Sequence, residues 1–237
     1  MKATAIIVAA GSGTRLGFDV PKAFVELGGN ALLWYSLRTI GAVAAIEEAV
    51  ITVPPAMESR ARSQVHAAGL EIPVKITPGG AERQDSVRIA LGMTSVEAEL
   101  VVVHDAARPF ATPAMFAATL AAAERVGGAI AATPLADTLK RVGEVAGHRG
   151  DKDRSIIATV AREGLWQAQT PQAFRRGLLM RAHERAALDS TVATDDADLV
   201  ERLGATVAVV DGSTLNFKIT TAADLRLAEL LAANPIR

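Results

Sequence analysis

Residues 5–17 read AIIVAAGSGTRLG, an apolar run that leads directly into a glycine-rich segment. The apolar half, residues 5–10, has the composition of a strand that is buried on both faces. Small residues after such a strand let backbone N–H groups approach phosphate oxygens closely. Ligands of parallel sheets bind at the carboxyl ends of strands, so this segment predicts a phosphate-binding loop. A glycine-rich turn without a ligand is the alternative, and the cations Arg15 and Lys22 nearby argue against it.

The spacing within the loop disfavours the two commonest nucleotide-binding folds. A dinucleotide-binding loop reads Gly-x-Gly-x-x-Gly, whereas here Gly17 comes one residue late and Arg15 lies inside the loop. A Rossmann dehydrogenase is therefore disfavoured, and the lysine-containing P-loop pattern is absent. Pro21 restricts the backbone before Lys22. Two cations beside such a loop suit a highly charged triphosphate.

Composition excludes several classes of protein. The chain has 237 residues, of which 50% are hydrophobic, and a formal net charge of −1. This balance gives no general attraction to nucleic acid or to an anionic membrane. The absence of cysteine excludes disulfides, thiolate metal sites and a cysteine nucleophile. No uncharged apolar stretch approaches the roughly 18 residues of a membrane span, so we expect a cytosolic protein without nucleic-acid or membrane partners.

Short apolar runs alternate with longer amphipathic segments, which predicts an α/β fold with a mostly parallel sheet and helices on both faces. We expect residues 1–237 to form a single domain. The predicted strands are residues 5–10, 49–53, 74–77, 100–104, 129–133 and 206–210, and the predicted helices are residues 32–43, 57–68, 81–93, 113–125, 173–188, 197–203 and 222–233.

Residues 138–160 interrupt this alternation. Two β-like halves flank a charged segment at residues 147–153 and predict a protruding β-hairpin arm. An isolated hairpin is marginally stable in water, so something must pack against it. A second copy of the same arm is the simplest partner, which predicts a homodimer joined through the arms.

Two further segments carry polar residues at the expected carboxyl edge of the sheet. Ser86 lies near the start of a predicted helix, where a hydroxyl and free N–H groups can meet a base or phosphate, although a capping role is the alternative. Asp105 can hold Mg²⁺ or a hydroxyl, and Arg108 can pair with a phosphate, unless the two form a structural ion pair. We expect His104 to make a structural hydrogen bond and Trp166 to pack in the core. The remaining histidines, expected at the surface, are His66, His148 and His183.

Motifs in a fixed order resemble the 2-C-methyl-D-erythritol 4-phosphate cytidylyltransferase family of the non-mevalonate isoprenoid route, within the wider nucleotidyltransferases. They are GSGTRLG at 11–17 followed by Pro21-Lys22, GGAERQDSV at 79–87, HDAARP at 104–109, TPQ at 170–172, TDDA at 194–197 and NFKIT at 216–220. The resemblance spans residues 4–230, and it departs at 18–20 and at the arm tip, 147–153. It implies a three-layer Rossmann-like nucleotidyltransferase fold with the arm as dimerisation element.

The resemblance also implies an activity, the transfer of CMP from CTP to the phosphate of 2-C-methyl-D-erythritol 4-phosphate with release of pyrophosphate. Mg²⁺ or another divalent cation would be the cofactor, held by Asp105 or by the CTP phosphates alone. The phosphate of the substrate is largely a dianion at neutral pH, because its second pKa is about 6, so no general base is required.

The roles that the resemblance implies divide into three groups. Arg15, Lys22 and Lys218 would be catalytic. Asp105, Arg108, Thr138, Arg162, Thr170 and Lys218 would bind the polyol phosphate, with Thr138 and Arg162 coming from the partner chain. The nucleotide would be bound by Ala9, Ala10, Gly11, Ser12, Gly13, Thr14, Gly79, Gly80, Ser86 and Asp105.

Two other functions stay open at this point. Ribitol-5-phosphate cytidylyltransferases share the fold and most of the loop, and His104 to Arg108 favours the methylerythritol family by resemblance. A non-catalytic nucleotide-binding regulator on the same fold is the second alternative. The joint presence of Arg15, Lys22, Asp105 and Lys218 argues against it.

Overall fold

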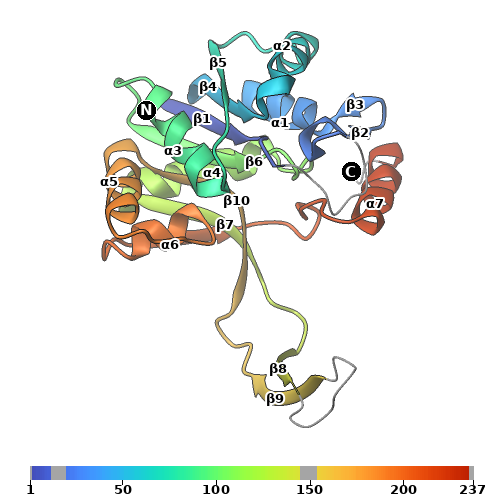
Figure 1. Cartoon of the computed structure of the whole chain (residues 1–237), viewed down its shortest axis with the longest axis vertical. Helices are drawn as coiled ribbons and strands as arrows, with labels where there is room; N and C mark the ends of the chain where they lie inside the picture. Colours follow the sequence, from blue (N-terminus) through green and yellow to red (C-terminus); the bar gives the residue numbers. More distant parts are fainter. Residues whose placement is uncertain (1, 12–19, 145–153, 235–237) are drawn as a thin grey trace.

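A mostly parallel β-sheet forms the centre of the protein (Figure 1). The computed structural model describes residues 2–11, 20–144 and 154–234. Within these residues seven strands form the sheet, in the order β11-β7-β10-β6-β1-β4-β5, and only β10 runs antiparallel to its neighbours. The predicted α/β class is confirmed. The strands are β1 (Ala3–Val8), β4 (Ile46–Val53), β5 (Val74–Pro78), β6 (Leu100–Asp105), β7 (Gly128–Pro134), β10 (Trp166–Arg175) and β11 (Val207–Asp211).

Helices cover both faces of this sheet, because the central strands are apolar on both faces. Successive residues of β1 alternate between the layers, so that Ile7 packs in one hydrophobic cluster and Ile6 in the other. The first layer contains α1 (Leu32–Gly41), α2 (Glu58–Ala67) and α4 (Pro113–Val126). The second layer contains α3 (Arg83–Met93), α5 (Arg176–Leu188) and α6 (Asp196–Glu201).

The C-terminal helix α7 (Ala222–Ala233) belongs to a third, smaller cluster beside the sheet. There it packs against the short hairpin of β2 (Glu26–Leu27) and β3 (Asn30–Ala31), with Leu225 and Leu27 buried between them. The described residues also contain two short 3-10 helices, η2 (Lys22–Phe24) and η3 (Pro55–Met57).

Helix α4 shows how local sequence sets the ends of an element. Its N-cap residue Thr112 accepts a hydrogen bond from the N–H of Met115 over 3.2 Å, and Pro113 begins the helix without needing an N–H partner. Gly127 ends the helix at φ 104°, a conformation that favours glycine. The observed helix therefore begins at the predicted residue and ends one residue beyond the predicted 113–125.

Strand β10 corrects the sequence interpretation. Residues 173–188 were expected to form one helix, but residues 173–175 end β10 and the helix begins at Arg176. Ala173 and Phe174 are fully buried between β6 and β7, where they pair in the antiparallel sense. Pairing with distant strands overrides the local helical pattern here.

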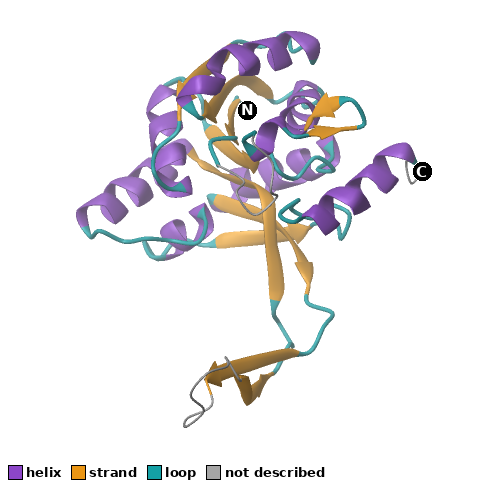
Figure 2. Ribbon diagram, turned by 45° about the vertical axis from the view of Figure 1, so that its right-hand side comes forward, coloured by secondary structure: helices purple, strands orange, loops and turns teal. Residues whose placement is uncertain are grey.

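The predicted arm is a β-hairpin of β8 (Leu139–Glu144) and β9 (Arg154–Val160) that projects away from the sheet (Figures 1 and 2). Trp166, expected in the core, is 44% exposed, because the start of β10 extends beyond the sheet toward the arm. Of the helices in the described ranges, none has the length and apolar character needed to cross a membrane.

Candidate active site

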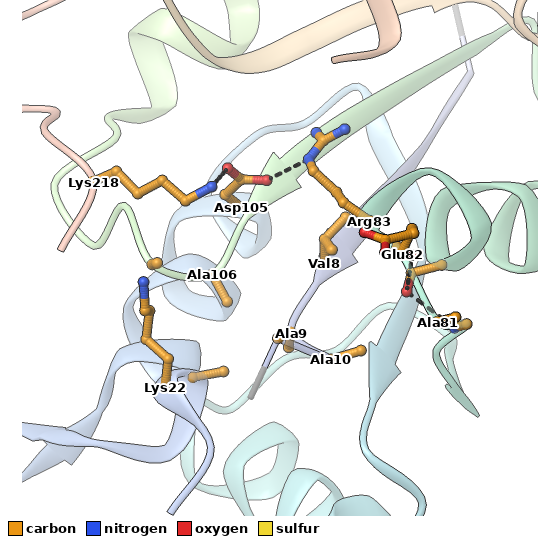
Figure 3. Close-up of a pocket in the computed structure, with 15 residues that line it drawn as sticks. Val8, Ala9, Ala10, Lys22, Ala81, Glu82, Arg83, Asp105, Ala106 and Lys218 are labelled. Carbon is orange, nitrogen blue, oxygen red and sulfur yellow. Dashed lines mark hydrogen bonds and ion pairs between the residues drawn. The ribbon is translucent and has the colours of Figure 1, made fainter. Parts of the chain in front are cut away.

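A pocket of about 260 Å³ opens at the carboxyl ends of β1 and β6 (Figure 3). Neighbouring parallel strands end there, and such an edge is where α/β sheets bind their ligands. The lining residues come from the segment after β1, the start of α3, the end of β6, the region of η2 and the segment before α7. They are Val8, Ala9, Ala10, Gly11, Lys22, Ala23, Gly80, Ala81, Glu82, Arg83, Ser86, Asp105, Ala106, Ala107 and Lys218.

A buried carboxylate between two cations forms the charged centre of the pocket. Asp105 accepts a hydrogen bond from Lys218 Nζ at 2.7 Å and another from Arg83 Nε at 3.0 Å (Figure 3). Burial by itself raises the pKa of this carboxyl, but Arg83 and then Lys218 outweigh that effect and hold the pKa well below its usual range. Asp105 is therefore ionised at neutral pH. Its ion-pair partners are Arg83 and Lys218, not Arg108, which was considered as an alternative structural partner.

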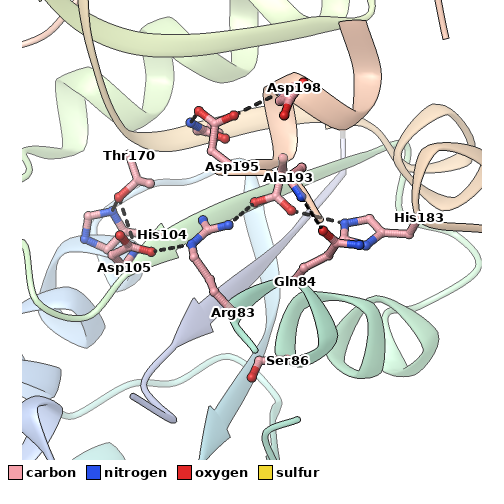
Figure 4. A network of polar contacts seen from close by, with 12 residues as sticks. Arg83, Gln84, Ser86, His104, Asp105, Thr170, His183, Ala193, Asp195 and Asp198 are labelled. Atoms are coloured by element: carbon pink, nitrogen blue, oxygen red, sulfur yellow. Dashed lines mark hydrogen bonds and ion pairs between the residues drawn. The ribbon is translucent and has the colours of Figure 1, made fainter. Parts of the chain in front are cut away.

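The polar network around Arg83 (Figure 4) contains a second buried carboxylate, that of Asp196. Arg83 Nη1 donates to Asp196 Oδ2 at 2.8 Å, and His183 Nε2 lies 3.1 Å from Asp196 Oδ1. His183 was expected at the surface, but it is only 2% exposed and faces Asp196, so that prediction is wrong. His66 is exposed as predicted, and His148 lies outside the described residues.

The start of α3 is fixed by hydrogen bonds within the chain. Glu82 and Asp85 form a reciprocal capping box. The Ser86 hydroxyl accepts from the N–H of Gly80 and donates to the carbonyl oxygen of Glu82, both over 3.1 Å. Ser86 therefore shapes the loop before α3 as well as lining the pocket.

The loop before α3 also packs closely on the segment after β1. A Cβ added at Gly79 would lie 2.2 Å from Ala10 Cβ and 2.7 Å from Ser86 Oγ. The space for a side chain at this position is therefore already filled.

The end of β6 is fixed by β10. The Thr170 hydroxyl accepts from the N–H of Asp105 at 3.1 Å and lies 3.0 Å from His104 Nδ1, while His104 Nε2 lies 3.2 Å from the carbonyl oxygen of Arg108. Burial lowers the pKa of His104 to about 4, so the ring is neutral at pH 7. Its Nε2–H then donates to the carbonyl and its Nδ1 accepts from Thr170. The structural role predicted for His104 is confirmed.

Arg108 binds backbone carbonyls beside the pocket. Its Nη1 donates to the carbonyl oxygen of Asn216 at 2.7 Å and its Nη2 donates to that of Ala168 at 3.4 Å. These bonds link the end of β6 to the segment that carries Lys218. Contact of Arg108 and Thr170 with a substrate stays a prediction.

Apart from Gly79, Arg108 and Thr170, whose contacts are given above, the predicted site residues fall into three places. The pocket contains Ala9, Ala10, Gly11, Lys22, Gly80, Ser86, Asp105 and Lys218. Thr138 and Arg162 are exposed at the two roots of the arm, where the Arg162 guanidinium donates to the carbonyl oxygen of Ala136. Ser12, Gly13, Thr14 and Arg15 lie outside the described residues.

Sequence reasoning missed the role of Arg83, Asp196 and His183. Arg83 and Asp196 both occur in the quoted motifs, but the residue pattern around them indicates no role. His183 follows Leu179 by one helical turn and precedes Ala186 on the buried face of α5, and this periodicity was the available signal.

Comparison with known proteins places the chain in a family. The family model for 2-C-methyl-D-erythritol 4-phosphate cytidylyltransferase matches residues 3–234. The protein of that name from Deinococcus radiodurans is 44% identical over 234 residues, which cover 98% of this chain and 90% of the relative.

Solved structures agree with this match. The 4-diphosphocytidyl-2C-methyl-D-erythritol synthase of Anaerococcus prevotii superposes with a TM-score of 0.84 at 29% identity, covering 98% of this chain and 96% of the other. The 2-C-methyl-D-erythritol 4-phosphate cytidylyltransferase of Thermus thermophilus superposes with a TM-score of 0.76 at 36% identity, covering 98% and 100%. The chain therefore belongs to the 2-C-methyl-D-erythritol 4-phosphate cytidylyltransferase family.

Proposed function

We propose that the protein transfers CMP from CTP to 2-C-methyl-D-erythritol 4-phosphate, giving 4-diphosphocytidyl-2-C-methyl-D-erythritol and pyrophosphate. The observation that supports this most is the composition of the pocket in a chain of this family. Lys22, Lys218 and Arg83 line the pocket together with Asp105 and the backbone after β1. Phosphate groups need that combination of cations and closely approaching N–H groups.

The reaction is a direct substitution at the α-phosphorus of CTP. An oxygen of the substrate phosphate attacks this phosphorus and forms a new P–O–P bond. The bond between the α-phosphorus and the oxygen that bridges to the β-phosphate breaks, and pyrophosphate leaves with that electron pair. The attacking phosphate is largely a dianion at neutral pH, since its second pKa is about 6. No proton has to be removed first, which agrees with the neutral His104 being engaged by Thr170 and Arg108.

The main obstacle is electrostatic, because one anion must approach another. Lys22 would offset the charge on the triphosphate, and Lys218, held by Asp105, would offset the charge on the attacking phosphate. Arg15, from the glycine-rich loop, would act on the triphosphate beside Lys22. Cations placed before the reaction stabilise charge that develops in the transition state.

A divalent cation fits this site mainly through the nucleotide. Mg²⁺ in nucleotide enzymes is commonly held by one or two carboxylates together with substrate phosphates. Among the described residues there is no cluster of three or more metal-binding side chains. Asp105 is the carboxylate that would hold the ion, since each of its oxygens accepts one N–H donor here and retains a lone pair. Bound Mg²⁺ would neutralise phosphate charge.

The arm is proposed to join two copies of the chain. Val142, Ile156 and Ile157 are 47%, 63% and 64% exposed on the described hairpin. Exposed apolar side chains on a two-stranded element favour a covering partner. We therefore propose a cytosolic homodimer in which Thr138 and Arg162 reach the polyol phosphate in the partner's site.

Mixing inactive chains tests the shared site. A Lys22→Ala chain and an Arg162→Ala chain are combined under conditions of subunit exchange. Mixed dimers with shared sites have one site with both defects and one with neither, so activity should partly return. No recovery despite proven exchange would refute the shared site. Ile157→Asp should shift sedimentation toward a monomer, and a wild-type monomer would refute the dimer.

Pyrophosphate release tests the activity itself. The protein is assayed with CTP, UTP, ATP and GTP, each with 2-C-methyl-D-erythritol 4-phosphate or ribitol 5-phosphate and with Mg²⁺ or EDTA. We expect turnover that requires CTP, methylerythritol phosphate and the cation. Equal turnover with UTP would refute the cytidylyl assignment, preference for ribitol phosphate would identify the other cytidylyltransferase activity, and no turnover would favour a regulator.

A further inference from the structure

The segment TDDA at 194–197 contains two aspartates with different environments. Asp195 is the N-cap residue of α6, and its side chain accepts from the N–H of Asp198 at 3.0 Å. Asp196 begins the helix and turns inward, where it is 1% exposed. Helix capping accounts for the first aspartate but leaves the second without a role.

We propose that Asp196 is a positioning residue, which orients the Arg83 guanidinium so that Arg83 in turn aligns Asp105 for catalysis. This inference rests on the proposed function. Substrate has no access to a side chain this buried, so Asp196 acts through Arg83.

The geometry of the guanidinium carries the first step of the argument. Arg83 donates from Nε to Asp105 Oδ1 at 3.0 Å and from Nη1 to Asp196 Oδ2 at 2.8 Å (Figure 4). A guanidinium is a rigid planar fork, so fixing one of its N–H groups fixes the direction of the others. With Asp105 Oδ1 engaged in this way, Oδ2 is directed to Lys218 at 2.7 Å.

Asp196 is itself held in place from two sides. His183 Nε2 lies 3.1 Å from its other oxygen, Oδ1, and both side chains are at most 2% exposed. Gln84, next to Arg83, accepts a hydrogen bond from the N–H of Ala193 through Oε1 at 2.9 Å and donates one through Nε2 to the carbonyl oxygen of Thr191 at 3.0 Å. The segment that carries Asp196 is thereby attached to the helix that carries Arg83.

Charge gives the second step. Arg83 and Lys218 bring two positive charges to the pocket wall, and Asp105 and Asp196 bring two negative charges. Without the Asp196 charge, Arg83 would retain Asp105 as its single anionic partner in this cluster. The guanidinium would then be held by Asp105 alone and free to turn toward the nucleotide phosphates. Asp105 would lose its fixed orientation, and Lys218 would lose its fixed acceptor.

The test compares Asp196→Asn with Asp198→Asn. Asp198 lies on the same helix but pairs with Arg202 at the surface, so it serves as a matched control. Pyrophosphate release is measured with CTP and 2-C-methyl-D-erythritol 4-phosphate. Loss of a residue that orients a metal ligand through a hydrogen bond commonly costs roughly 10–100-fold in activity, and Asp196 has a comparable position relative to Asp105 through Arg83. We expect a loss of that size in kcat for Asp196→Asn, with a smaller change in the KM for CTP, and a wild-type kcat for Asp198→Asn. Equal losses in both variants would overturn the proposal.

A double-mutant cycle separates positioning from a general structural effect. If Asp196 acts through Asp105, adding Asp196→Asn to Asp105→Asn should cost less than about threefold further activity. Losses that multiply would overturn the proposal. The activity of the wild type distinguishes failure of the proposed function from failure of this inference. An inactive wild type would refute both. An active wild type with multiplying losses in the variants would refute the inference alone.

A second variant keeps the test valid if thermal unfolding shows that Asp196→Asn does not fold. Arg83→Lys retains the charge, but a single ammonium group cannot present a planar fork to both carboxylates. A loss of kcat of the same size supports the proposal, and a wild-type kcat overturns it.

Discussion

Replacement of Gly79 by alanine should reduce activity by distorting the pocket wall. Gly79 lies between β5 and α3, and its N–H donates to the carbonyl oxygen of Val53 at 2.9 Å. The constraint is one of space, because an added Cβ would lie 2.2 Å from Ala10 Cβ and 2.7 Å from Ser86 Oγ. Ala10 belongs to the predicted phosphate-binding loop, and Ser86, in the first turn of α3, is one of the predicted nucleotide-binding residues. The substitution therefore pushes apart two sides of one pocket.

The size of the effect follows from the overlap. Ordinary contacts of a Cβ begin at 3.4 Å, so one of the two segments must move by about 1 Å. Overpacking of this kind commonly costs about 1–3 kcal/mol of stability, which should lower Tm by several degrees. A displacement of about 1 Å in groups that position a substrate can reduce the rate roughly 10²-fold. We expect a loss of that order in kcat/KM for CTP.

Gly92→Ala is the matched control. Gly92 lies in α3, the helix that follows Gly79, is exposed, and has no atom within 4 Å of the position of an added Cβ. Alanine there should stabilise the protein by about 0.5–1 kcal/mol through helix propensity, without changing activity. Thermal unfolding and pyrophosphate release are measured for both variants. Wild-type activity in Gly79→Ala would refute the steric argument, and an equal loss of activity in Gly92→Ala would do the same.

Three further predictions concern ionisable groups in the pocket and directly behind it. Lys22→Ala should lower kcat roughly 10²–10³-fold with a smaller change in KM, and a large rise in KM at unchanged kcat would show instead that Lys22 only binds ground-state CTP. Burial alone would raise the pKa of Asp105, but Arg83 and Lys218 together outweigh burial and hold this pKa well below its value of about 3.9 in the unfolded chain. The ionised Asp105 therefore contributes its full stabilisation above about pH 5, and this contribution is lost as the pH falls. The Tm difference between wild type and Asp105→Asn should consequently shrink between about pH 7 and about pH 3, and a constant difference would contradict this. Because the pKa of His104 is about 4, its ring should remain neutral down to about pH 5 in an NMR titration, and protonation near pH 6.5 would show that the ring is not buried as described.

The parallel part of the fold could be predicted from the sequence, because its strands are buried on both faces. Residues 5–10 and 100–104 are nearly continuous apolar runs, and burial on both sides is what such runs require. β10 could not be predicted in this way. Its residues mix polar and apolar types, and its extended state depends on pairing with β6 and β7, which are distant in sequence.

The candidate site divides in the same manner. Lys22, Asp105 and Lys218 could be assigned to one pocket, because each lies within a recognisable motif. Arg83 and Asp196 are 113 positions apart in the chain, so no local sequence pattern predicts their contact. It could have been inferred only by asking which buried anion accompanies a cation at the start of α3, since buried charges are almost always paired.

The same strand that local sequence did not reveal connects the pocket to the arm. Thr170, near the middle of β10, holds the N–H of Asp105, and Trp166, at the start of β10, lies at the root of the arm. Strands rise about 3.3 Å per residue, so these two residues are separated by roughly 13 Å of continuous backbone. If two arms pack together as proposed, their contacts act on one end of the strand whose middle fixes Asp105. The arm then has two physical routes to the chemistry, through the side chains at its roots in the partner's pocket and through β10 in its own.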